Sequence, residues 1–110
     1  MTQDLIYIQL KKMEDLIRLV VLSPTPFIQH TIIEGKHVYF VQGTLSLGRP
    51  VIYFFQGAEE IQKKYVVYNR FKDEVGYSDQ PSSDGQTVSI PIIEIEKTNL
   101  FEKIFEKEVV

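Results

Sequence analysis

The apolar positions of the first 22 residues recur with the period of an α-helix. Five of them form one stripe, at alternating spacings of four and three residues: Ile6, Leu10, Met13, Ile17 and Val20. Such a stripe is typical of a helix that packs one face on a core. Ser23 and Pro24 end the pattern, because proline supplies no backbone N–H. We therefore predict a long N-terminal helix over residues 4–22, of about five turns.

The pattern then changes to runs of β-branched and aromatic residues, which favour strands. Turn-forming residues separate these runs. This pattern predicts four to five antiparallel strands that follow one another in sequence as a meander. The expected strands are 27–34, 37–45, 49–56, 65–72 and 87–97. Pro91 lies in the last of them, and because proline cannot donate to a ladder, we expect this strand at an edge of the sheet.

Two hairpins set the register of the first three strands. A tight turn that begins at Gly35 pairs Glu34 with His37, and the next turn pairs Leu45 with Arg49. Side chains alternate between the two faces of a strand, so these pairings assign each residue to a face. Apolar residues fall on both faces. One face carries the residues that we expect at an interface: Tyr39, Val41, Tyr53 and Phe55.

The end of the chain predicts a short helix. Asn99 and Glu102 have the spacing of a capping box, and Phe101 and Ile104 follow as an apolar face. The expected fold is α+β. It has a long N-terminal helix packed on a four- to five-stranded antiparallel meander sheet, with a short C-terminal helix, in a single domain over residues 1–110.

An antiparallel sheet that is apolar on both faces needs cover on both sides. The long helix covers one face. The C-terminal helix, roughly 13 Å long, is shorter than the width of four strands, about 19 Å. We therefore predict that a second copy or another protein completes the cover, which makes the chain a homodimer or a non-enzymatic protein-protein interaction module. A monomer closed by the twist of the sheet and by the tail is the alternative.

Composition narrows the chemistry. The chain has 110 residues and no cysteine, which excludes disulfides, thiol nucleophiles and cysteine-ligated metal clusters. Its net charge of −3 gives no general attraction for a phosphate backbone. The N-terminus does not resemble a signal peptide, and no apolar run approaches the roughly 20 residues that span a bilayer. These features predict a cytoplasmic protein with no membrane partner.

Basic and aromatic residues interleave only between residues 63 and 72. On a strand, Tyr68, Arg70 and Lys72 would point the same way and place a stacking ring beside two cations. This pattern supports one alternative function, weak binding of single-stranded nucleic acid. Its candidate residues are Lys63, Lys64, Tyr68, Arg70 and Lys72. The competing interpretation is an edge strand protected by charge.

His30 and His37 are the two histidines of the chain. In the expected register they share a face but lie about four strand positions apart, too far to hold one ion by bonds of about 2 Å. We therefore predict no metal and no cofactor. Glu94 and Glu96 share one face of a strand, but no nucleophile or base lies beside them in the sequence, and no catalytic residue is assigned. A small-ligand or enzymatic pocket between helix and sheet is the second alternative function.

Overall fold

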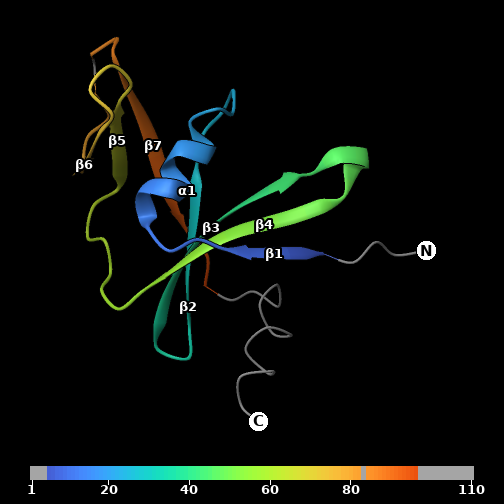
Figure 1. Ribbon diagram of the computed structural model, residues 1–110. Helices are drawn as coiled ribbons and strands as arrows, with labels where there is room; N and C mark the ends of the chain where they lie inside the picture. Colours follow the sequence, from blue (N-terminus) through green and yellow to red (C-terminus); the bar gives the residue numbers. More distant parts are fainter. Residues whose placement is uncertain (1–4, 83, 97–110) are drawn as a thin grey trace.

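Strands are the main regular structure of the computed structural model in Figure 1, in which residues 5–82 and 84–96 are described. Seven strands form one mixed sheet in the order β1-β4-β3-β2-β7-β5-β6. They are β1 (Ile6–Gln9), β2 (Ile28–Ile33), β3 (Lys36–Thr44), β4 (Pro50–Gly57), β5 (Tyr65–Asn69), β6 (Glu74–Ser78) and β7 (Thr87–Glu94). The described residues also form one α-helix, α1 (Met13–Val20), and a 3-10 turn, η1 (Ser46–Gly48).

The predicted long helix over residues 4–22 is wrong. Residues Ile6–Gln9 form β1, which pairs in parallel with β4, and the helix begins at Met13. The apolar stripe has helical spacing throughout, but Ile6 and Ile8 are β-branched and favour a strand once β4 offers an edge. The eight-residue helix that remains buries four side chains: Met13, Leu16, Ile17 and Val20.

The predicted antiparallel meander of four to five strands is also wrong. The β1–β4 and β2–β7 pairs are parallel, and the other neighbours in the sheet are antiparallel. The run predicted as one strand over residues 65–72 ends at Asn69. Asp73 then takes a positive φ of 52°, a conformation that aspartate tolerates, and the chain returns as β6.

β7 lies between β2 and β5, so the edge position predicted for its strand is wrong. Pro91 is opposite Tyr65 of β5, whereas pairing with β2 begins one residue later, at Ile92. The missing N–H of Pro91 therefore falls where β7 changes from one partner to the other, which explains why the interior of the sheet accepts it.

The β2–β3 hairpin turns one residue earlier than predicted. Its two turn residues, Glu34 and Gly35, have positive φ values of 51° and 79°. These are the angles of a type I′ turn, which matches the twist of a hairpin and favours glycine at its second position. The predicted pairing of Glu34 with His37 is consequently wrong, because His37 pairs with Ile32.

The β3–β4 hairpin has the predicted register, and the N–H of Leu45 donates to the carbonyl of Arg49 at 2.7 Å. As expected, the central strands are apolar on both faces. α1 lies against one of these faces, near the place where β2, β3 and β7 approach one another (Figure 1).

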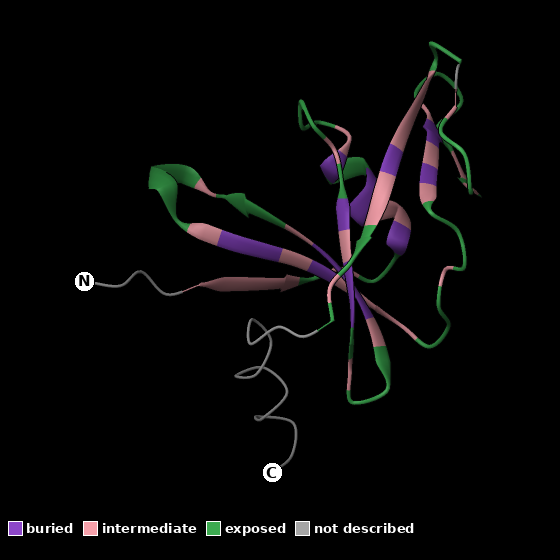
Figure 2. Cartoon of the chain, turned by 180° about the vertical axis from the view of Figure 1, so that it is seen from behind, coloured by how far each residue is buried: buried purple, intermediate pink, exposed green. Residues whose placement is uncertain are grey.

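On the opposite face the apolar side chains of β3 and β4 are buried within a single copy of the chain, and Figure 2 shows the buried stretches along both strands. At most 3% of each side chain is exposed in the set Val38, Phe40, Ile52 and Phe54. Four residues pack against this set: Leu5, Tyr7, Ile33 and Ile95. The face of the sheet opposite α1 is thus already shielded, and the homodimer stays a prediction.

The predicted C-terminal helix, with Asn99 as its cap, lies outside the described residues. Within the described ranges no helix is both long and apolar enough to cross a membrane. A cytoplasmic location stays a prediction.

Candidate metal centre

His30 lies in the middle of the sheet and is buried, with 1% of its surface exposed. Its cross-strand neighbours are Tyr39 on β3 and Glu94 on β7. Paired residues of adjacent strands project from the same face, so the three side chains form one row. The row joins an imidazole to a carboxylate that lies 64 positions further along the chain.

Both ring nitrogens of His30 have partners. Nδ1 lies 2.5 Å from Oε2 of Glu94, and Nε2 lies 3.0 Å from Nδ1 of His37. Because an ionised carboxylate only accepts hydrogen bonds, His30 donates to Glu94 from Nδ1. When His30 is neutral, its Nε2 accepts a hydrogen bond from His37. The ring of His30 also stacks on Tyr39, with centroids 4.5 Å apart, so its orientation is set from three sides.

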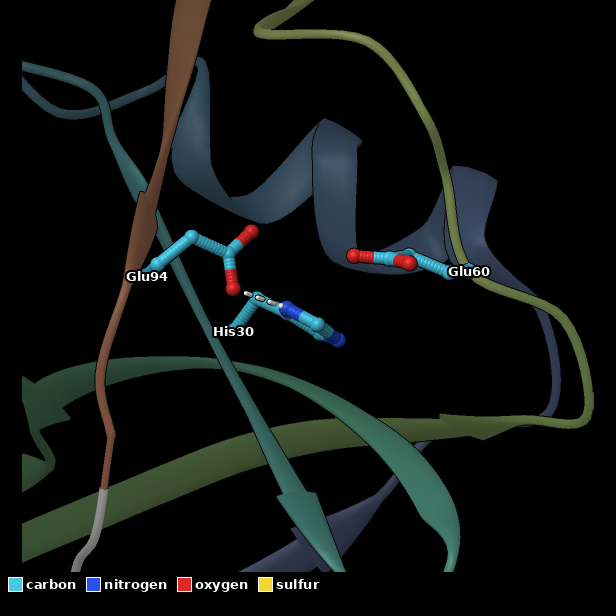
Figure 3. A group of neighbouring side chains, drawn as sticks. All are labelled: His30, Glu60 and Glu94. Carbon is cyan, nitrogen blue, oxygen red and sulfur yellow. Dashed lines mark hydrogen bonds and ion pairs between the residues drawn. The ribbon is translucent and has the colours of Figure 1, made fainter.

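Glu60 brings a second carboxylate from the loop between β4 and β5. The N–H of the next residue, Ile61, donates to the Tyr39 hydroxyl at 2.7 Å, which ties the loop to the sheet. One ligand atom each from His30, Glu60 and Glu94 lie within 4.8 Å of one another. Figure 3 shows the two carboxylates reaching toward the imidazole from different sides.

Negative charge is concentrated at this site. Glu60 and Glu94 are exposed, and His30 forms the buried floor between them. Burial, and also the charges of these two carboxylates, raise the pKa of the Tyr39 hydroxyl. Among the described residues, lysine and arginine form ion pairs elsewhere: Arg18 with Asp15 and Asp73, and Lys63 with Asp79. A bound cation would neutralise the charge of the two carboxylates.

One imidazole nitrogen and two carboxylate oxygens suit a divalent transition metal ion. With bonds of about 2.0–2.2 Å to nitrogen and oxygen, the ion would replace the proton between His30 and Glu94. The Glu94 carboxylate would then have to move away from the His30 ring by about 1 Å. Its side chain is 64% exposed and has the freedom to do so. The Nε2–H of His30 would donate to His37, which is the outer hydrogen bond that orients a metal-binding imidazole.

The predicted separation of His30 and His37, about four strand positions, is wrong. The expectation that the two histidines cannot serve one site depended on that separation. With the β2–β3 register shifted, the two residues are diagonal neighbours whose rings stack at 5.2 Å. The sequence did not predict the contact between Glu94 and His30, because β2 and β7 are far apart along the chain. The available signal is weaker: Glu94 follows an apolar run in β7, whereas His30 stands between two other polar residues of β2.

The four predicted interface residues lie on the same face as His30. Tyr39 is buried, and the other three are half-buried against the core on the side of α1: Val41, Tyr53 and Phe55. The aromatic face expected to meet a partner is therefore packed largely against the chain's own helix and strands.

The predicted nucleic-acid residues do not form the expected row. The four basic candidates are exposed and flank β5: Lys63, Lys64, Arg70 and Lys72. The ring of Tyr68 is buried in the core, and its hydroxyl donates to Asp73 at 2.6 Å. The structure therefore separates the aromatic ring from the exposed cations, and nucleic-acid binding through this segment stays a prediction.

No family model, no curated protein and no solved structure matches this chain. The chemistry of the chain's own side chains is therefore the basis for assigning a function.

Proposed function

We propose that this protein binds a divalent transition metal ion, zinc in the first instance, through His30, Glu60 and Glu94. The observation that carries the proposal is the convergence of two exposed carboxylates on one nitrogen of a buried imidazole. A mixed nitrogen and oxygen ligand set favours zinc and similar ions over calcium or magnesium, which prefer oxygen alone. Three protein ligands leave a coordination position open for water or another small molecule.

The surrounding residues support binding by holding the ligands in place. Stacking on Tyr39 and the hydrogen bond to His37 restrict the His30 ring, so little side-chain freedom remains to be lost when a metal binds. Tyr39 also accepts the hydrogen bond from Ile61 and thereby positions the loop that carries Glu60. We assign Tyr39 and His37 as positioning residues of the site.

The test is calorimetric titration of the purified, chelator-treated full chain with zinc. Glu60→Gln and Glu94→Gln each remove a ligand charge from an exposed side chain, so both variants should fold and should bind zinc at least about 10-fold more weakly. Glu59→Gln is the matched control, because Glu59 is also an exposed glutamate of the same loop but lies outside the cluster. It should bind zinc like the natural chain.

Tyr39→Phe separates positioning from ligation. It deletes the hydroxyl that holds the Glu60 loop but leaves all three ligands, so zinc affinity should fall while the stoichiometry stays at one ion per chain. Binding should also stabilise the fold, by about 2.7 kcal/mol at a free zinc concentration 100 times the Kd. Absence of saturable zinc binding by the natural chain, or equal weakening by Glu59→Gln and Glu60→Gln, would overturn the proposal.

A further inference from the structure

An apolar cavity of about 270 Å³ lies where the end of α1 and the loop after it face the β3–β4 hairpin. It shares no residue with the candidate metal centre. Five apolar side chains form its walls: Leu19, Val20, Phe27, Val41 and Tyr53. Leu19 and Phe27 are among the large apolar residues that the described part of the chain leaves exposed. The cavity thus has an apolar interior with an apolar rim.

The polar groups of this cavity carry no charge. Ser23 and Thr25 contribute hydroxyl groups from the loop. A charged ligand would lose hydration here without gaining an ionic partner, whereas a neutral polar group would find hydrogen bonds.

We infer that this cavity binds a small neutral molecule with an apolar body and a hydroxyl or amide end. Ligand sites are typically concave and mostly apolar, with a few polar groups that fix orientation. The volume lies just below the usual range of about 300–1,000 Å³, which favours a short chain or a single ring system over a larger ligand. The apolar body would lie between Phe27 and Val41, and its polar end would face the loop hydroxyls.

Gly43 offers a way to fill the cavity without disturbing the fold. It lines the cavity and lies two positions after Val41 on β3, so a side chain added there projects from the same face. An added Cβ would meet only a methyl carbon of Val51, at the ordinary contact distance of 3.8 Å. Gly43 also lacks the positive φ found at Gly35 and Gly48, so a larger residue is not strained.

The test uses fluorescence titration of the full chain with the neutral probe 2-naphthol, a single ring system with one hydroxyl group. We expect saturable binding that Gly43→Leu weakens at least about 10-fold, because the new side chain occupies the space of the ligand. Gly85→Leu is the matched control, since Gly85 has no neighbour within 4 Å of an added Cβ and lies outside the cavity. It should leave the affinity unchanged.

Competition on the natural chain tests the chemistry of the ligand independently of any variant. The neutral alcohol 1-octanol should displace the probe at least about 10-fold more effectively than octanoate, whose charge finds no partner in the lining. No saturable probe binding, equal binding by Gly43→Leu, or equal displacement by the two competitors would overturn the inference. Removal of metal should affect none of these results, because the two sites share no residue.

Discussion

Substitution of Ile52 tests whether the chain itself closes the face of the sheet opposite α1. The Ile52 side chain is 0% exposed and packs with Val38, Phe40 and Phe54. Removing buried carbon atoms costs their transfer free energy and leaves a cavity, so Ile52→Val should cost about 0.5–1.5 kcal/mol and Ile52→Ala about 2–5 kcal/mol. At about 4 °C per kcal/mol for a chain of this size, the alanine variant should lower Tm by roughly 8–20 °C.

The assay is thermal unfolding followed by circular dichroism, at protein concentrations about 100-fold apart. If one copy buries Ile52, Tm should be the same at both concentrations. Ile32 is the matched control, because it is an isoleucine of the same sheet, on β2, and is 57% exposed. Ile32→Val should change stability by no more than about 0.5 kcal/mol. A loss below about 1 kcal/mol for Ile52→Ala, or a Tm that rises with concentration, would refute the reasoning and favour cover by a second copy.

Two further predictions concern polar groups. Thr31→Val should leave stability unchanged or raise it by about 1 kcal/mol in urea unfolding, because the buried Thr31 hydroxyl oxygen finds no hydrogen-bond partner among the described residues. A loss above about 1 kcal/mol would indicate a partner in solution. Asp73→Asn should reduce the loss of stability in acid. Hydrogen bonds from the Tyr68 hydroxyl, which has the larger effect, and from the Arg18 guanidinium hold the pKa of Asp73 below 3.8. The stability that these contacts provide is therefore present above pH 3.8. It is lost as pH falls from 3.8 through the lowered folded-state value. In Asp73→Asn, the urea midpoints measured above and below this pH should differ less than they do in the natural chain. An unchanged difference would argue against a stabilising contact of Asp73 with Tyr68 and Arg18.

Local patterns were sufficient for the β3–β4 hairpin. Its two apolar runs flank a short turn, and the predicted pairing of Leu45 with Arg49 is confirmed by the hydrogen bond between them. The same alternation predicted apolar residues on both faces of the central strands, which the two core clusters confirm. These features depend on side chains only a few residues apart, so the sequence determines them without knowledge of distant partners.

Pairing between remote segments decided the rest of the fold. Ile6 and Ile8 fit a helical stripe by spacing, and β1 exists because β4 presents an edge to them. Likewise, Glu94 meets His30 only because β7 pairs in parallel with β2. Parallel neighbours are joined by long connections instead of tight turns, so no local signal records which segments will pair.

The candidate metal centre shows the same division. The sequence places His30 in one predicted strand and Glu94 in another. The tertiary structure brings Glu94 to His30 and stacks the buried His30 ring on Tyr39. It also adds Glu60, from a loop that one hydrogen bond to Tyr39 holds in place. Burial and convergence depend on the packing of four separate segments, and packing is a property of the folded chain that periodicity along the sequence does not record.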